Sequence, residues 1–409
     1  ARVIEENRAP QIKKLPPLTG GLVGYFAYDY IKYAEPTLRL DAEDQEKFRD
    51  VDLMLFDKMI AFDHYRQKII LICNSRISEA DVQAEGGQTA GAAAATDLRA
   101  RGKSARAAAD AAEPDTLEAV YRTALQTLDQ MQDIIEKGAK KNVSAGRLTT
   151  ELTPLFDQES YCEKVEQVKH YIHEGDILQL VLSNRLEAGF DGSLLDTYRI
   201  LRTKNPSPYM FYFSSDDLEI AGASPETLVK VDNQTAYTFP LAGTRPRGKD
   251  EKEDQELEAD LLSDEKELAE HNMLVDLGRN DLGKISKFGT VEVEQYMKVQ
   301  RYSHVMHIGS TVKGEIDDSR YDELSAVDAV LPAGTLSGAP KIRACQIINE
   351  LEDNKRGIYG GAIGYIDFTG NLDTCIAIRI AYKKGDKVFV RSGAGIVADS
   401  VPANEFQEC

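Results

Sequence analysis

The chain has 409 residues, and a single hydrophobic core rarely serves more than about 300, so we expect two lobes or one large two-layer domain. Acidic residues outnumber basic ones by 68 to 49, and the net charge of −19 argues against a surface that binds nucleic acid or an anionic membrane. The apolar fraction of 42% is ordinary for a globular protein and argues against disorder.

Neither a targeting signal nor a disulfide framework is apparent. No stretch reaches the roughly 18 apolar residues of a membrane span, and the first residues lack the apolar core of a signal peptide. The five cysteines are scattered and form no CxxC pair, which favours a reduced, cytoplasmic location. The chain starts at Ala1 without a Met and stops at Cys409 in mid-pattern, so we expect a fragment.

Residues 1–75 are expected to form an N-terminal region. Residues 16–31 predict a turn followed by a strand rich in aromatic residues. Residues 51–64 and 67–73 predict an antiparallel pair of strands.

The chain changes character after this region. Residues 76–115 are rich in Ala and predict a low-complexity insertion, and residues 116–145 contain a helical pattern that connects to the second part. Residues 146–409 interleave helices with hairpins, which predicts an α+β fold. Three helices are expected: one over 159–176 that Gly175 stops, one over 263–277 that Ser263 caps, and one across 339–352. Strands are expected over 177–188, 290–300 and 305–316, with three short strands within 210–244 and hairpins over 361–397.

Two pairs of glutamates are spaced so that each pair shares a helix face. Glu267 and Glu270 are three residues apart, and Glu405 and Glu408 repeat this spacing at the end of the chain. Two such pairs that converge can hold a hard cation such as Mg²⁺ and leave positions open for water and substrate. The alternative is a solvated acidic face, which is the commoner role of such pairs.

Three loops have the composition of an anion-binding turn. Residues 240–248, PLAGTRPRG, combine glycines with Thr and Arg, which offer donors and can clamp a carboxylate. Residues 332–340, PAGTLSGAP, and 391–396, RSGAGI, are small-residue loops that can cradle an anionic ligand. A basic surface turn in the first case and tight turns in the others account for the same patterns.

The motif SHVMH contains His304 and His307. On a strand, residues three apart face opposite sides, so these two are poorly placed to share a metal. Either could act as a general base near neutral pH, although a packed or surface position is the simpler interpretation for His304. The residues alone therefore indicate an acidic enzyme for an Mg²⁺-assisted reaction on a small anion.

Taken as an ordered set, the motifs are far more specific than any one of them. The chain contains, in this order, GASPETLVK, PLAGTRPRG, DEKELAEHNMLVDLGRNDLGK, RYSHVMHIGSTVKG, GTLSGAPKIRA, YGGAIGY, LDTCIAIR and SGAGIVADSVPANEF. This set resembles the chorismate-binding enzymes, most closely the large subunits of anthranilate synthases, from about residue 146 to the last residue. Residues 20–29, GGLVGYFAYD, match the family's less specific N-terminal part.

The resemblance implies two packed, mostly antiparallel sheets with helices outside and the active site between the lobes. It implies that Glu270 and Glu408 hold Mg²⁺, that Glu267 and Glu405 help through water, and that the metal grips the ring carboxylate of chorismate. Glu226 matches the general acid that protonates the departing ring hydroxyl, and a raised pKa would suit that role.

Further site residues follow from the same resemblance. Tyr359 and Arg379 match the residues that hold the enolpyruvyl carboxylate, a task for which the arginine fork is suited. His307 matches the histidine linked to proton removal and loss of pyruvate. Pocket positions are matched by Gly243, Thr244, Thr335, Gly393, Ala394 and Gly395.

Two positions distinguish the family's members. Members that add water carry a Lys where this chain has Gln179, and aminodeoxychorismate synthases commonly carry a Lys where it has Ala242. Both positions favour amination at C2 and elimination of pyruvate, which gives anthranilate for tryptophan biosynthesis. An ordinary strand residue at 179 and a packing residue at 242 remain alternatives, as do an aminodeoxychorismate synthase and a weakly catalytic, tryptophan-binding regulatory subunit.

The resemblance also implies partners. Ammonia would come from a separate glutamine amidotransferase subunit, because this chain has no glutaminase-like Cys motif. Half of a tryptophan inhibitor site would consist of Asn205, Pro206, Tyr209, Met210 and Cys375. A rigid PSP turn and core packing explain these residues too. The other half of the inhibitor site normally lies upstream, before this sequence begins, so feedback control of this polypeptide stays open. Relatives place a Lys shortly after the second Glu pair, whereas this sequence stops at Cys409, so we expect this polypeptide to bind Mg²⁺ weakly and turn over poorly, unlike its full-length parent.

Overall fold

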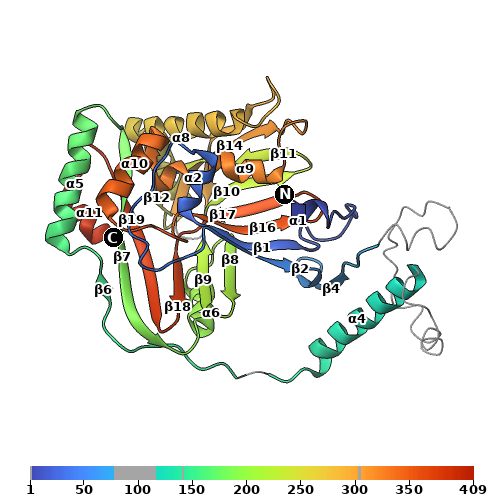
Figure 1. Ribbon diagram of the computed structural model, residues 1–409. Coiled ribbons are helices and arrows are strands. Elements are labelled where there is room, and N and C mark those ends of the chain that lie inside the picture. Colours follow the sequence, from blue (N-terminus) through green and yellow to red (C-terminus); the bar gives the residue numbers. More distant parts are fainter. Residues whose placement is uncertain (1, 78–116, 141, 303–304) are drawn as a thin grey trace.

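A computed structural model shows an α+β fold in which two large sheets pack against each other and helices cover their outer faces (Figure 1). The expected fold class is therefore confirmed. The structure describes residues 2–77, 117–140, 142–302 and 305–409. His304 and nearly all of the predicted insertion lie outside the described residues, and the proposed region boundaries stay a prediction.

The first sheet consists of β1 (Gly21–Phe26), β2 (Val51–Phe56), β10 (Thr227–Asp232), β11 (Thr235–Thr238), β12 (Leu241–Pro246), β13 (Glu292–Arg301), β14 (Val305–Glu315), β16 (Ala362–Asp367) and β17 (Leu372–Ile376). Its order is β12-β14-β11-β10-β17-β16-β1-β2, with β13 also paired to β14. All of these pairings are antiparallel. Phe26 of β1 lies opposite Ala362 of β16, so the sheet joins the two ends of the chain.

The second sheet consists of β5 (Arg147–Leu148), β6 (Thr153–Pro154), β7 (Gln179–Asp191), β8 (Tyr209–Ser214), β9 (Leu218–Ser224), β15 (Gly338–Ala339), β18 (Ile380–Lys384) and β19 (Lys387–Ile396). Its main order is β15-β7-β19-β18-β9-β8. Residues 180–185 of β7 are all buried, because this strand is covered on both faces. The hairpin β3 (Lys58–Asp63) and β4 (Lys68–Cys73) forms a separate two-stranded sheet.

The helices are α1 (Arg2–Glu5), α2 (Ile31–Ala34), α4 (Leu117–Lys137), α5 (Gln158–His173), α6 (Leu195–Lys204), α7 (Glu251–Ser263), α8 (Glu265–Gly283), α9 (Glu323–Val330), α10 (Lys341–Glu352) and α11 (Pro402–Glu408), with short 3-10 turns at η1 (Tyr28–Tyr30) and η3 (Gly334–Leu336). α8 and α9 pack on the first sheet (Figure 1). α10 packs on β7, α11 packs on β19, and α4 packs on β4. Among the described residues, no helix combines the length and the apolar character that crossing a membrane requires.

The packing of α10 shows how the sequence pattern builds the core. Its apolar residues recur at helical spacing, and their side chains meet Leu180 and Leu182 of β7. Each fully buried side chain of this kind stabilises the fold by about 1.5–3 kcal/mol. The buried apolar residues of α10 are Ala344, Cys345, Ile347, Ile348 and Leu351.

One predicted helix start was wrong. Ser263 does not cap α8; it is the last residue of α7, an acidic helix that was not predicted. Asp264 is the cap, and its carboxylate accepts hydrogen bonds from the backbone N–H groups of Lys266 and Glu267. Gly175 does stop α5, because it takes φ +84°, which favours glycine.

Two strand predictions need correction. Residues 51–64 do not form one strand, since the chain breaks at Asp57 and sends β2 to the first sheet and β3 to the hairpin with β4. Residues 210–244 contribute to five strands instead of three, β8 to β12. The connection between β9 and β10 crosses from the second sheet to the first, which a sequence pattern cannot reveal.

Candidate active site

Glu226 lies where the two sheets meet, in the short connection between β9 and β10. Its backbone is fixed to the end of β17, because Ile376 N–H donates to the Glu226 carbonyl at 3.0 Å. The Ser224 hydroxyl donates to the Ile376 carbonyl at 2.7 Å. Neighbouring strands of both sheets therefore set the position of this carboxyl group.

The environment of Glu226 suits proton transfer near neutral pH. Burial raises the pKa of Glu226 to about 7, and a hydrogen bond from the Thr335 hydroxyl opposes that rise. Thr335, on η3, donates to Oε1 of Glu226 at 3.2 Å. Glu226 and Thr335 also line a cavity of about 50 Å³ against α8. A carboxyl group with such a pKa is half protonated at pH 7 and can serve as a general acid.

His307 lies on β14, opposite Thr244 of β12. Its Nδ1 is 2.9 Å from the Gly243 carbonyl and 3.1 Å from the Thr244 hydroxyl. Because a carbonyl only accepts, the geometry assigns the proton to Nδ1 and leaves Nε2 as an acceptor. The Tyr302 ring packs edge-on against His307 at 5.7 Å. The charge of Glu226 contributes to the raised pKa of Tyr302, so these three groups share one region.

Gly243 brings the β12 backbone against the first glutamate pair. It takes φ +69°, and a Cβ there would lie 2.9 Å from Leu261 and 3.3 Å from Oε2 of Glu267. Only glycine combines this conformation with such a close approach. Thr244 is exposed beside it. The predicted loop 240–248 therefore lies against α7 and α8, and Arg245 of this loop bonds to Asp260 and Asp264. Its role as an anion-binding loop stays a prediction.

A second group of predicted residues gathers where β7 begins and β19 ends. A Cβ at Gly393 would lie 3.0 Å from the Tyr359 hydroxyl, whereas a Cβ at Gly395 would meet nothing within 4 Å. Tyr359 is buried, and that burial raises its pKa. Gln179 pairs with β15 at the same end, and no side-chain hydrogen bond holds it within the described part of the chain.

Ala394 differs from its two glycine neighbours. Successive residues of a strand face opposite sides, and the Ala394 side chain is buried in the cluster that contains α10. Its predicted place in the pocket can therefore involve only its backbone.

Arg379 has the features of a residue that binds an anion. It is exposed, and within residues 305–409 and the other described ranges it makes no ion pair or side-chain hydrogen bond. Its backbone takes φ +52°, which costs a residue with a Cβ on the order of 1–2 kcal/mol. The Ala223 N–H donates to the Arg379 carbonyl at 3.2 Å and fixes this conformation. Such strain at an unpaired arginine is typical of a binding position.

The two glutamate pairs lie on α8 and α11. Burial, and then the charge of Glu267, raises the pKa of Glu270, which has no cation partner among the described residues. Glu405 is partly buried and Glu408 is exposed. Within the described part of the chain, no three His, Cys, Asp or Glu side chains are close enough to hold a metal. The Mg²⁺ assignment therefore stays a prediction.

The predicted inhibitor residues lie around β8. The Tyr209 hydroxyl donates to Asp373 at 2.8 Å and lies 2.8 Å from the Thr227 hydroxyl. Tyr209 packs on the cluster that contains Cys375, where burial raises the thiol pKa to about 12. Met210 accepts from Ser207 N–H at 3.3 Å, and Asn205 and Pro206 follow α6. The structure brings Tyr209 and Cys375 together, and their role as an inhibitor site stays a prediction.

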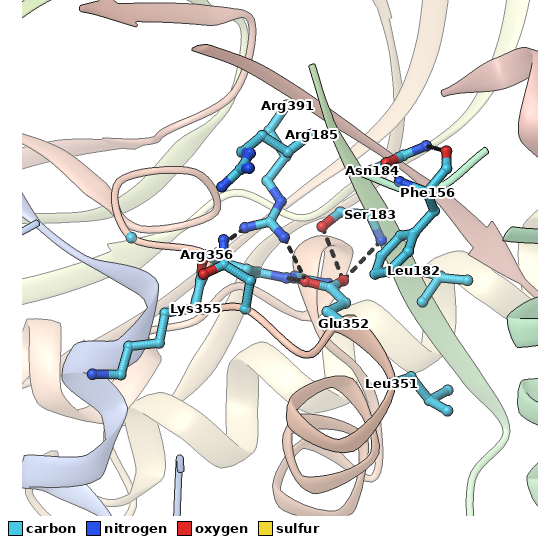
Figure 2. A network of polar contacts seen from close by, with 12 residues as sticks. Phe156, Leu182, Ser183, Asn184, Arg185, Leu351, Glu352, Lys355, Arg356 and Arg391 are labelled. Carbon is cyan, nitrogen blue, oxygen red and sulfur yellow. Dashed lines mark hydrogen bonds and ion pairs between the residues drawn. The ribbon is translucent and has the colours of Figure 1, made fainter. Parts of the chain in front are cut away.

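Sequence reasoning missed a buried ionic network next to the site (Figure 2). Glu352 and Arg356 form an ion pair at 2.6 Å, with each side chain 1% exposed, and Arg391 contacts the same carboxylate at 3.3 Å. The spacing of four residues between Glu352 and Arg356 is the usual pattern of an exposed helix surface, so the burial of this pair could not be predicted from the spacing.

Comparisons with known proteins agree with this geometry. The buried carboxyl group of Glu226, whose pKa is raised to about 7, is typical of the active site of an enzyme that transfers protons. A family model described as chorismate binding enzyme matches residues 1–409. The chain belongs to this family of chorismate-binding enzymes.

Several relatives carry one name. The chain is 44% identical over 409 residues to "Anthranilate synthase component 1" of Acetivibrio thermocellus, covering 100% of this chain and 76% of the relative. It is 42% identical over 399 residues to the protein of that name from Aquifex aeolicus, covering 97% and 73%.

Two solved structures align with this chain. Anthranilate synthase component I from Streptococcus pneumoniae TIGR4 aligns with a TM-score of 0.78 and 36% identity over 100% of this chain and 82% of that one. The menaquinone-specific isochorismate synthase from Escherichia coli, at 24% identity and a TM-score of 0.60 over 71% and 66%, shares the fold.

Proposed function

We propose that this chain is the aminating component of an anthranilate synthase. It would add ammonia to C2 of chorismate and then eliminate pyruvate to give anthranilate, the first committed step of tryptophan biosynthesis. The observation that carries this proposal is the Glu226 carboxyl group, with a pKa of about 7, held by Thr335 at the junction of the two sheets. The relatives named anthranilate synthase component 1 support it.

Glu226 would act in the first step. As ammonia forms a bond to C2, the C1=C2 double bond moves to C1=C6 and the C5=C6 double bond moves to C4=C5. The ring hydroxyl then leaves C4 with its bonding electron pair, takes a proton from the Glu226 carboxyl group and departs as water. The pKa near 7 keeps enough acid protonated at neutral pH while allowing the proton to leave. Thr335 would hold the carboxyl group in the direction of the leaving hydroxyl.

A base is needed in the second step. Removal of the proton on C2 allows the C3–O bond of the enolpyruvyl ether to break, which releases pyruvate and leaves an aromatic ring. His307 suits this role, because its Nδ1–H donates to the Gly243 carbonyl and its Nε2 is left to accept the proton. Gln179 cannot deprotonate water, which favours a nitrogen nucleophile in the first step.

Tyr359 and Arg379 would bind the enolpyruvyl carboxylate. The Tyr359 hydroxyl lies beside Gly393, whose missing side chain leaves room there, and Arg379 is free to supply a bidentate ion pair. The open space at Gly395 extends the same surface.

The residues of α8 fit a magnesium ion. Glu267 and Glu270 offer neighbouring carboxylate oxygens, the ligands that Mg²⁺ prefers, and the partly buried charge of Glu270 lacks a partner cation within the described residues. Glu408, and Glu405 through water, would complete the site. When bound, the ion would neutralise the ring carboxylate and make the ring a better acceptor of the nucleophile.

We further propose that ammonia reaches this chain from a glutamine amidotransferase subunit in a cytoplasmic hetero-oligomer. The name component 1 of the relatives supports a second component. Tryptophan would be the feedback inhibitor, bound in part by residues around β8.

A product assay tests the function. The chain is mixed with chorismate, Mg²⁺ and an ammonium salt, and anthranilate is followed by its fluorescence, which the absence of Trp from this chain leaves unobscured. We expect anthranilate and pyruvate in equal amounts, and their loss in Glu226→Gln. An aminated product that retains its enolpyruvyl group would contradict the proposal.

A further inference from the structure

A buried cluster of charges connects the end of α10 with β7 and β19 (Figure 2). It lies next to the proposed active site, because Arg356 also donates to the carbonyl of Leu336, the neighbour of Thr335. Arg356 lies just beyond α10 and donates to the Glu352 carboxylate through Nε at 2.9 Å and Nη2 at 2.6 Å. The two side chains are each 1% exposed. The proposed reaction gives this ion pair no role, although the removal of two charges from water is unfavourable before their bonds are counted.

Arg356 bonds to the backbone of two segments that carry site residues. Its Nη1 donates to the carbonyl of Leu336, the residue that follows Thr335 on η3. Its Nη2 donates to the carbonyl of Val181 at 2.7 Å, and Val181 pairs with Gly395 across β7 and β19. One guanidinium group therefore ties the Thr335 turn to the strand that borders the pocket glycines.

The same guanidinium group also contacts aromatic rings of the site region. Its centre lies 4.5 Å from the ring of Tyr28 and 5.9 Å from the ring of Tyr359. Such contacts stabilise most strongly when they are buried, and these depend on the plane of the guanidinium group. A lysine, which presents a point charge, cannot reproduce this arrangement.

Glu352 holds the guanidinium group in place. Its Oε1 accepts from the backbone N–H of Ser183 at 2.8 Å and from the Ser183 hydroxyl at 2.9 Å. Its Oε2 accepts from Arg391 at 3.3 Å. The carboxylate is thus anchored to β7 and β19 independently of Arg356, so it can serve as a fixed reference for the arginine.

We propose that Arg356, held by Glu352, is a positioning residue that fixes the Thr335 turn relative to β7, so that Thr335 orients Glu226 for proton transfer. This inference rests on the proposed function. The Thr335–Glu226 bond is 3.2 Å long, so a shift of the turn by a few tenths of an ångström breaks it. A misplacement of about 1 Å in an active site can lower the rate on the order of 100-fold.

The test compares Arg356→Lys with a matched control, Arg185→Lys. Arg185 is also a buried arginine that bonds to a glutamate, Glu187, but it bonds to neither the Leu336 nor the Val181 carbonyl. With ammonium as the nitrogen donor, we expect Arg356→Lys to lower kcat by roughly 10- to 100-fold and to change KM for chorismate by less than about 3-fold. The control should keep the kcat of the wild type.

A second measurement separates positioning from a general structural effect. If Arg356 acts through Thr335, then Arg356→Lys should lower kcat by less than about 3-fold in a Thr335→Ala background, because the bond it protects is already absent. An equal loss in both backgrounds overturns the inference. If Arg356→Lys does not fold, Ser183→Ala replaces it, because this variant removes one hydrogen-bond donor to Glu352. We expect Ser183→Ala to lower kcat less than Arg356→Lys would, and again to have little effect in the Thr335→Ala background.

The outcomes are distinguishable from failure of the proposed function. Because we expect weak Mg²⁺ binding and poor turnover, the wild type is assayed with excess Mg²⁺ and a high enzyme concentration. A wild-type chain that makes no anthranilate under these conditions refutes the proposed function, and the inference falls with it. If the wild type makes anthranilate, two results overturn the inference and leave the proposed function intact. One is an Arg356→Lys variant with the kcat of the wild type, and the other is an Arg185→Lys control that loses as much kcat as Arg356→Lys.

Discussion

The hydrogen bond between Thr335 and Glu226 should be visible in the pH dependence of the reaction. Thr335→Val keeps the shape of the side chain and removes the hydroxyl that donates to Oε1 at 3.2 Å. This bond favours the charged form of Glu226 and so lowers its pKa, whereas burial raises the pKa to about 7. Removing the bond therefore raises the pKa further.

The size of the effect follows from the strength of the bond. A hydrogen bond of this kind contributes about 0.5–1.5 kcal/mol, and 1.36 kcal/mol corresponds to one pH unit. Glu226 must be protonated to act as the acid, so kcat/KM for chorismate falls as pH rises past its pKa. The midpoint of this fall should move from near pH 7 in the wild type to a value roughly 0.5–1 higher in Thr335→Val.

The assay is initial-rate anthranilate fluorescence between pH 5 and 9, with ammonia held at a fixed free concentration. Thr374→Val is a suitable control, because Thr374 is a buried threonine that bonds to the Val229 carbonyl and not to Glu226. A midpoint that stays in place in Thr335→Val, or moves to lower pH, refutes the assigned link between Thr335 and the acid.

Three further outcomes are expected. Glu226→Gln should raise the free energy of urea unfolding at pH 8 by at most about 3 kcal/mol and leave it unchanged at pH 4. The reason is that the raised pKa of Glu226 destabilises the wild-type fold as pH rises from 4.5 to 7. A gain in stability at both pH values would contradict this cause. Arg379→Gln should raise KM for chorismate at least ~10-fold and leave unfolding within about 0.5 kcal/mol, and an unchanged KM would remove Arg379 from the site. Asp264→Ala should lower the free energy of unfolding by about 1 kcal/mol in the same titration, whereas no loss would mean that Asp264 does not cap α8.

The sequence predicted the elements whose signals are local. The terminal hairpins, with turns near residues 369 and 385, and the long strand before Asp191 follow from turn residues and apolar runs. The helix that carries Glu267 was also predicted, but its cap was misplaced by one residue because Ser263 and Asp264 are both good caps. α9 was missed, since its eight residues are too short for a clear period.

Site residues were predicted only as far as motifs identified them. Glu226, Thr335 and His307 came from the ordered motifs, and the structure places Thr335 against the Glu226 carboxyl group. Spacing alone could not reveal this contact, because 109 positions separate the two residues. Arg356 was missed for the same physical reason. Its burial depends on β7, which contacts it through Val181, a residue that is distant from it in the sequence.

The pairing of β1 with β16 has a consequence for synthesis of the chain. Phe26 meets Ala362, so the first sheet cannot close until nearly all of the chain has left the ribosome. At the usual 5–20 residues per second, the apolar strand GLVGYF waits roughly 20–70 s for its partner. During that time its edge and side chains are open to other nascent chains, so the yield of native protein should depend on chaperones that shield such segments during translation.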